Sequence, residues 1–137
     1  MITRRDAVTS AALLLLQSAV SDANAQEKQS SSANVYQHDL PNVTMDGWEV
    51  NVAEVTFPPG YSGKAHHHPG FVLVYVLEGA LETKVSGLPK KTYQAGEMFF
   101  EAPGSTHEVN HNVSESRSAK ILAMIFAKKG LPLTTPA

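Results

Sequence analysis

The chain has 137 residues, 42% of them hydrophobic, and a formal net charge of −2 at pH 7. This length supports one hydrophobic core and is too short for two domains of ordinary size. The small net charge, without a basic cluster beyond the first five residues, argues against nucleic acid and anionic membrane surfaces as partners, and the absence of cysteine excludes a disulfide framework.

Residues 1–25 have the pattern of a cleavable export signal. Arg4 and Arg5 form its charged start, an apolar run extends from residue 11 to residue 20, and Ala23-Asn24-Ala25 matches a small-x-small cleavage site. The run of about ten apolar residues is shorter than the roughly 20 that a membrane-spanning helix needs. We therefore expect a signal peptide cleaved after Ala25, by the Sec or the twin-arginine route, and a periplasmic or secreted protein without a stable membrane anchor. An ordinary N-terminal helix is the alternative.

Residues 26–34, QEKQSSSAN, are polar and Ser-rich, which predicts a disordered leader. Beyond them, short apolar or alternating segments separated by Gly and Pro predict strands at 35–40, 47–57 with an irregularity near Ala53, 62–68, 71–77, 80–85, 91–94, 97–101, 107–113 and 119–127. The continuously apolar run 71–77, FVLVYVL, predicts a strand buried on both faces. No segment has a convincing helical period, so we expect an all-β sandwich or barrel over residues 35–127 and a C-terminal tail at 128–137.

Three histidines are candidate metal ligands. A β-strand has a side-chain period of two, so His66 and His68 share one face, whereas His67 points to the other. His107 lies farther along the chain, after a Pro-Gly turn. Imidazole suits zinc, copper, iron and nickel, so the pattern predicts a metal site. Three unrelated surface histidines are the alternative.

These histidines belong to two spaced motifs. In the first, five residues separate Gly60 from the run His66-His67-His68, and Gly79 closes the motif; in the second, Gly96 precedes Pro103-Gly104-Ser105-Thr106-His107. The two motifs, in this order, resemble those of the cupins, which are small double-stranded β-helix or jelly-roll barrels. The resemblance implies such a barrel, in which His66, His68 and His107 hold one divalent metal ion. Fe2+ or Mn2+ is preferred, with Ni2+ or Zn2+ as alternatives.

Two positions depart from the cupin pattern. The glutamate that usually provides a fourth ligand falls on Val72 or Leu73, and a hydrocarbon side chain cannot bind a metal ion. Some cupins, thiol and diketone dioxygenases among them, use three histidines, so the resemblance still implies a metal. His111 takes the usual Asn position, between Asn110 and Asn112. We expect it on the face of His107 but about 13 Å along the strand, as a polar residue low in the barrel rather than a ligand.

Glu101 is the candidate replacement for the missing carboxylate. A symmetric hairpin of 97–101 and 107–113 would pair Glu101 with His107, Phe99 with Val109 and Glu97 with His111. Directly opposed residues share a face, so Glu101 would point into the barrel with His107. We predict it as the catalytic residue, which orients His107, binds the metal weakly or acts as a base. A solvated charge at the rim is the alternative. Val72, Val74, Val76, Phe99 and Val109 are expected to line an apolar pocket for a small molecule.

The resemblance implies an exported, metal-binding cupin, and we expect an Fe- or Mn-dependent, dioxygenase-like oxidoreductase that acts on a small organic substrate. Two alternatives stay open: a non-redox metal-dependent isomerase or lyase with Glu101 as proton shuttle, and a non-catalytic module that binds a small ligand or a metal. We also expect a homodimer, because Phe71, Leu73, Tyr75 and Leu77 would present apolar side chains outward.

Overall fold

A computed structural model describes residues 30–137 of the chain. The strands of this part are β1 (Trp48–Phe57), β2 (His66–His67), β3 (Phe71–Glu78), β4 (Ala80–Val85), β5 (Lys91–Gln94), β6 (Met98–Glu101), β7 (Thr106–Asn112), β8 (Ala119–Lys128) and β9 (Thr135–Pro136). Within residues 30–137 no helix is long and apolar enough to cross a membrane. The predicted signal peptide, 1–25, and the first residues of the predicted leader, 26–29, lie outside the described residues.

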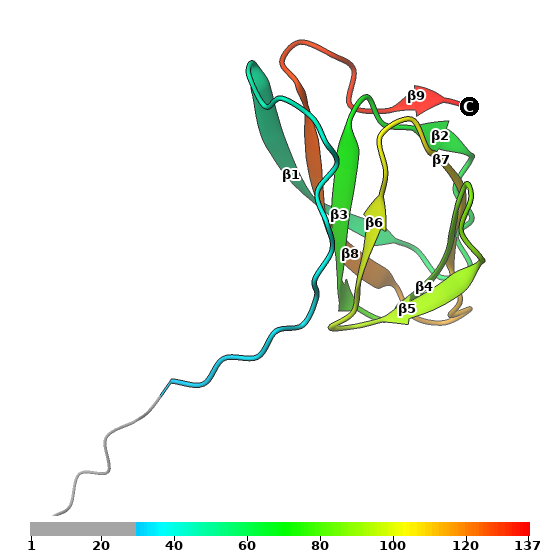
Figure 1. Cartoon of the computed structure of the whole chain (residues 1–137). Helices are drawn as coiled ribbons and strands as arrows, with labels where there is room; N and C mark the ends of the chain where they lie inside the picture. Colours follow the sequence, from blue (N-terminus) through cyan, green and yellow to red (C-terminus); the bar gives the residue numbers. More distant parts are fainter. Residues whose placement is uncertain (1–29) are drawn as a thin grey trace, which may run out of the picture. The chain divides into compact units, whose positions relative to one another are not determined.

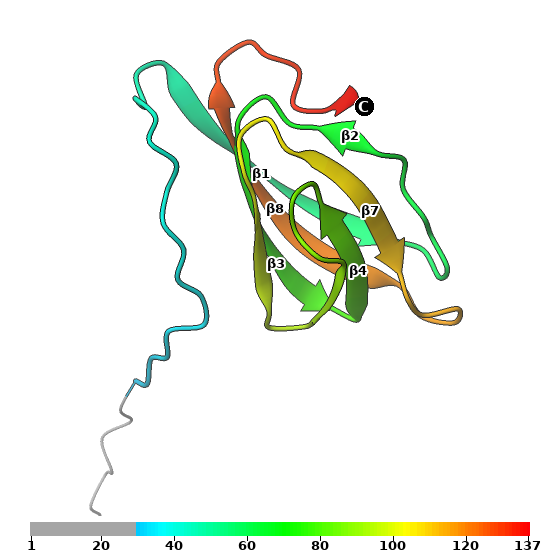
Figure 2. The same cartoon turned by 45° about the vertical axis from the view of Figure 1, so that its right-hand side comes forward.

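The strands form two antiparallel sheets that face each other (Figures 1 and 2). One sheet has four strands in the order β1-β8-β3-β6, and the other has five in the order β5-β4-β7-β2-β9. Most neighbours in space are not neighbours in sequence, because the chain passes repeatedly from one sheet to the other. This is the jelly-roll arrangement, and the predicted all-β fold class is confirmed.

The hydrophobic core fills the space between the sheets. Alternate residues of β3 point inward, and Val72, Val74 and Val76 are at most 2% exposed. The residues between them, Leu73 and Tyr75, are only half-buried. On the outer face Phe71 is 1% exposed, and the ring of His38 stacks on Phe100 of the neighbouring strand β6. The prediction that β3 is buried on both faces is therefore wrong at Leu73 and Tyr75.

Several predicted strand boundaries are also wrong. Residues 35–40 have no regular structure, and 62–68 contributes only the two residues of β2. The predicted irregularity near Ala53 is absent from β1, which pairs with β8 in unbroken register from Trp48↔Lys128 to Phe57↔Ala119. The residues predicted as a C-terminal tail contain β9, which pairs with β2.

The predicted hairpin of 97–101 with 107–113 does not form. Strand β6 pairs with β3 in the four-stranded sheet, whereas β7 pairs with β4 and β2 in the other sheet. The segment between β6 and β7 therefore crosses from one sheet to the other. None of the expected pairs, Glu101 with His107 among them, is a ladder pair.

A β-bulge in β7 changes which of its side chains point inward. Val85 pairs with His107 and Lys84 with Val109, so Glu108 is an extra residue. An extra residue shifts the alternation by one position. As a result Val109 shares the outer side of the sheet with Lys84, and His111 pairs with Glu82 on that side, so the predictions that Val109 and His111 point inward are wrong.

The same shift turns Asn110 and Asn112 inward, in place of Val109 and His111. Asn110 points inward opposite Thr83, and Asn112 is completely buried. The Asn112 amide Nδ2 donates hydrogen bonds to the carbonyl oxygens of Phe57 (3.1 Å), Pro58 (2.9 Å) and Arg117 (2.8 Å). Asn112 thus ties three chain segments together.

Candidate metal centre

The three predicted metal ligands lie together at one end of the barrel. His66 is the ladder partner of His107, across the pairing of β2 with β7. The ring centroid of His66 lies 4.9 Å from that of His68 and 5.0 Å from that of His107. His67 points away from this group, and its Nδ1 lies 3.3 Å from the carbonyl oxygen of Ser105.

Glu101 approaches the same cluster from the opposite sheet. It ends β6, is 4% exposed, and places Oε1 3.2 Å from His107 Nδ1 and Oε2 3.7 Å from His68 Nε2. The expectation that Glu101 faces His107 inside the barrel is correct, although the hairpin from which it was drawn does not exist. The ladder partner of Glu101 is Val72, which is one of the two positions for the missing glutamate of the first motif. Glu101 therefore places a carboxylate beside this position, from the adjacent strand β6.

Each of the three imidazoles has one ring nitrogen held by the protein. His66 Nδ1 donates to the carbonyl of Lys64 at 2.9 Å, and His68 Nδ1 donates to the carbonyl of Leu133 at 2.6 Å. His107 Nε2 is hydrogen-bonded to the hydroxyl of Thr83. Since a carbonyl accepts only, Nε2 of His66 and of His68 must keep its lone pair in the neutral ring. This arrangement, with one nitrogen held and the other free, is typical of histidines that bind metals.

His107 Nδ1 is a buried ring nitrogen without a hydrogen-bond partner. Such atoms are rare because a buried polar group without a partner destabilises the fold by about 1–3 kcal/mol. The Thr83 hydroxyl can accept from Nε2–H or donate to Nε2. In the first tautomer Nδ1 turns a lone pair toward the Glu101 carboxylate, and in the second Nδ1–H faces it. In the first tautomer, two electron-rich atoms that face each other at 3.2 Å are stabilised by a cation bound to both.

The donor set fits a divalent metal ion. With metal–ligand bonds of about 2.1 Å, neighbouring ligand atoms lie about 3.0–3.5 Å apart, which is close to the separations of Glu101 from His107 and His68. Within residues 30–137, however, no three His, Asp or Glu side chains already have the arrangement that holds a metal ion. The donors would have to move toward one another when an ion binds.

Burial affects the pKa of His66. It lowers the pKa of His66, and the neighbouring His107 and His68 also lower it, whereas the Lys64 carbonyl and Glu101 oppose the shift. A lowered pKa favours the neutral imidazole, which is the form that binds a metal ion.

A cavity of about 430 Å³ extends from this cluster into the barrel. Its walls are mostly apolar side chains of β1, β3 and β8: Ala53, Val55, Phe57, Val72, Val74, Ile121, Ala123 and Ile125. Its polar groups, besides the cluster, include Tyr61, Asn110 and Thr134. The side-chain oxygen of Asn110 is buried and has no hydrogen-bond partner. A mostly apolar cavity with a few polar groups is the usual form of a small-molecule site.

Sequence reasoning missed three contributors to this site. Thr83 carried no signal because its role depends on the ladder of β4 with β7. Asn110 points inward because of the bulge, which is not evident in the sequence. Leu133 lies in a segment that was predicted as a tail.

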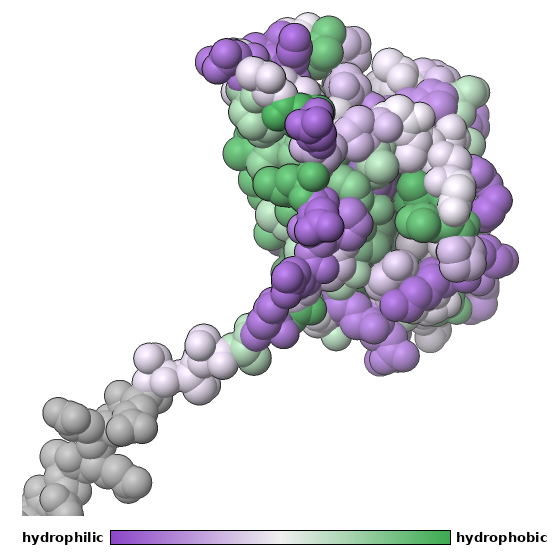
Figure 3. Space-filling model, viewed as in Figure 1, coloured by the Kyte–Doolittle hydropathy of each residue, from purple (hydrophilic) through white to green (hydrophobic). Residues whose placement is uncertain are grey.

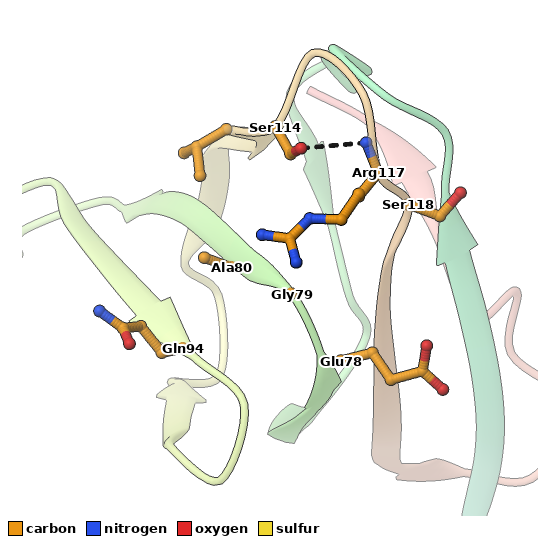
Figure 4. A pocket seen from close by; sticks show the side chains of 8 residues that line it. Glu78, Gly79, Ala80, Gln94, Ser114, Arg117 and Ser118 are labelled. Carbon is orange, nitrogen blue, oxygen red and sulfur yellow. Dashed lines mark hydrogen bonds between the residues drawn. The ribbon is translucent and has the colours of Figure 1, made fainter.

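A second hollow lies between the start of β4 and the loop before β8 (Figure 4). The side chain of Arg117 extends into it toward Gly79 and Ala80, and the backbone N–H of Arg117 donates to Ser114 Oγ at 3.0 Å. Glu78 at its edge has an exposed carboxylate near Lys120. This hollow contains no histidine and no buried titratable group, so it does not compete with the cluster as a candidate site.

The facing sheets, with histidines at one end and an apolar cavity behind them, define a jelly-roll barrel with an internal candidate site. The family model described as "Cupin domain" matches residues 53–125, which is more than half of the chain. The protein therefore belongs to the cupin family. No curated protein sequence gives a match to the chain.

Several solved structures have the same fold. DMSP lyase DddQ from Ruegeria pomeroyi DSS-3 is 19% identical, with a TM-score of 0.56 over 64% of this chain and 43% of the lyase chain. An oxalate oxidase in complex with the substrate analogue glycolate is 20% identical, with a TM-score of 0.53 over 77% of this chain and 59% of the oxidase chain. A predicted oxalate decarboxylase from Thermotoga maritima is 28% identical, with a TM-score of 0.50 over 56% of this chain and 64% of the decarboxylase chain. The chain thus spans less than two thirds of each of these proteins.

Proposed function

We propose that the protein is a metal-dependent enzyme in which His66, His68, His107 and Glu101 hold one divalent ion, Fe2+ or Mn2+ by preference. The observation that carries the proposal is the buried, unpartnered Nδ1 of His107 beside the Glu101 carboxylate. In the tautomer that turns the Nδ1 lone pair toward Glu101, a cation held by His107 and Glu101 would satisfy the lone pair and compensate the carboxylate charge. The preferred reaction is a dioxygenase-like oxidation of a small organic substrate.

The bound ion would supply Lewis acidity and, with iron or manganese, redox chemistry. The protein contributes the remaining functions. Glu101 lowers the net charge of the site by one and can hold a proton at Oε1 or Oε2. The apolar walls formed by Val72, Val74 and Ile125 exclude water. The unpartnered oxygen of Asn110 accepts a hydrogen bond from a hydroxyl or N–H of the substrate and so orients it.

A lyase is the second candidate. The observation in its favour is the buried carboxylate of Glu101 beside the cavity, where it could remove a proton from a substrate bound in the cavity. The fold similarity to a DMSP lyase supports this alternative, as the fold similarity to an oxalate oxidase supports the first. A fold hosts many functions, so these similarities do not choose between the two.

The test compares protein loaded without oxygen with Fe2+, Mn2+ or Zn2+, on a panel of small carboxylates, hydroxy acids and phenols. Oxygen uptake in step with substrate loss, by the iron or manganese form alone, is the expected result. Equal turnover with zinc and no oxygen uptake would replace the oxidase proposal with the lyase. Stable metal binding without turnover on any compound would leave the non-catalytic binding module.

We also propose that two copies of the chain pair through the outer face of the four-stranded sheet. Val50 and Val52 on this face are 49% and 57% exposed, and Val52 lies beside Met124, which in turn pairs with Leu73. Figure 3 shows apolar side chains gathered on the side where β1 and β3 lie. Phe71, which was expected in this interface, is instead 1% exposed beneath neighbouring aromatic rings.

Export through a signal peptide at 1–25, with cleavage after Ala25, remains our proposal for the location of the protein. It is supported by Arg4 and Arg5, the apolar run that follows them and the small residues at 23–25.

A further inference from the structure

The last residues of the chain return to the end of the barrel that holds the histidines. Strand β9 pairs with β2, with His66 opposite Pro136 and His67 opposite Thr135. The backbone N–H of Ala137 donates to the carbonyl of Ala65 at 3.3 Å. In Figures 1 and 2 the segment that follows β8 runs across this end of the barrel to lie beside β2. The C-terminal segment is therefore the edge strand next to the candidate ligand His66.

Leu133 anchors this segment and contacts the site in two ways. Its side chain packs against the hydrophobic core and lines the cavity. Its carbonyl oxygen accepts the 2.6 Å hydrogen bond from His68 Nδ1. Leu131, two residues earlier, is 46% exposed and does not line the cavity. The two leucines of this segment therefore differ in their exposure and in their contact with the site.

The hydrogen bond from His68 matters because β2 ends at His67. No ladder therefore fixes the backbone at His68, and the ring orientation depends on its own contacts. A carbonyl oxygen can only accept, so in neutral His68 the Leu133 carbonyl keeps the proton on Nδ1. In that form the Nε2 lone pair lies on the side of Glu101, 3.7 Å from its carboxylate.

We propose that residues 131–137 are a working part of the metal centre, in which the Leu133 carbonyl positions His68 and the Leu133 side chain closes the cavity. This inference rests on the proposed metal site. It assigns a positioning role to a main-chain group of the C-terminal segment. Loss of a group that orients a metal ligand typically weakens metal binding by about 10- to 100-fold.

The test compares Leu133→Ala with the matched control Leu131→Ala and with a chain that ends at Gly130. Long-range 1H–15N NMR of the metal-free proteins reports which nitrogen of His68 carries the proton. Zn2+ affinity is measured by competition with a chromophoric chelator. Wild type and Leu131→Ala should hold the proton on Nδ1 and bind Zn2+ equally within about twofold, whereas Leu133→Ala and the shortened chain should show mixed proton positions and about 10- to 100-fold weaker binding.

An unchanged proton position on His68 in Leu133→Ala and in the shortened chain would overturn the inference, as would equal losses in Leu133→Ala and Leu131→Ala. Leu133→Ala keeps the carbonyl but removes the side chain that anchors it against the core. This variant therefore still tests the inference if the shortened protein does not fold. If the wild-type protein binds no metal, the proposed function fails. The NMR comparison then still decides whether Leu133 positions His68.

Discussion

Replacing Glu101 with glutamine should have opposite effects on the metal-free and the metal-bound protein. The side chain is 4% exposed and lies between His107 Nδ1 at 3.2 Å and His68 Nε2 at 3.7 Å. A buried carboxylate opposes folding by several kcal/mol, which the histidines offset in part. Glutamine keeps the size and removes the charge, so we expect Glu101→Gln to raise the free energy of unfolding of the metal-free protein by about 1–3 kcal/mol.

At about 4 °C per kcal/mol for a domain of this size, the metal-free Tm should rise by about 4–12 °C. Loss of the charged ligand should weaken metal binding by at least about tenfold, so saturating Mn2+ or Zn2+ should raise the Tm of the variant much less than that of the wild type. Thermal unfolding with and without metal measures both effects. The control is Glu49→Gln, at an exposed position on β1. It should change neither the metal-free Tm nor the metal-induced rise in Tm. A lower metal-free Tm in Glu101→Gln, or an unchanged metal-induced shift, would refute the reasoning.

The other predictions concern a supporting hydroxyl, the dimer and export. Thr83→Val removes the hydrogen bond to His107 Nε2 and should weaken Zn2+ binding by about tenfold in chelator competition, whereas Thr83→Ser should restore it; equal affinities of Thr83→Val and the wild type would contradict this. Val52→Glu places a charge on the exposed apolar face and should convert dimers to monomers in sedimentation, and a wild type that sediments as a monomer would end the dimer proposal. Mass spectrometry of the protein from its native host should give a mature chain that starts at Gln26, and a chain that retains residues 1–25 would contradict export.

The histidine cluster was predictable because its signals are local. Strand periodicity separates His66 and His68 from His67, and the second Pro-Gly turn marks the position of His107. The site therefore followed from spacing in two short motifs. The pairing of the strands at 97–101 and 107–113 could not be predicted in this way. A five-residue connection between two strands is compatible with both a hairpin and a crossing between sheets.

Glu101 illustrates a correct residue reached through a wrong pairing. The expected hairpin would have placed it beside His107 in one sheet, but it reaches His107 from the opposite sheet as the ladder partner of Val72. Both arrangements point the side chain into the barrel. Alternation along a strand decides the face, whereas the neighbour depends on contacts distant in sequence.

The bulge at Glu108 and the return of the C-terminal segment were not predictable for the same reason. A single extra residue reverses the faces of Val109 and His111, and no composition signal marks it. The segment around Leu133 has too few residues and too little alternation to predict a strand. Its order comes from pairing with β2 and from the partial burial of Leu133 against the core.

The metal content of untagged protein tests the central claim most directly. Elemental analysis of the wild type, His66→Ala, His107→Ala and His67→Ala compares two proposed ligands with their outward-facing neighbour. We expect about one divalent ion per chain in the wild type and in His67→Ala, and almost none in His66→Ala and His107→Ala. A full complement of metal in His66→Ala or His107→Ala, or an equal loss in His67→Ala, would contradict a metal centre built from these side chains.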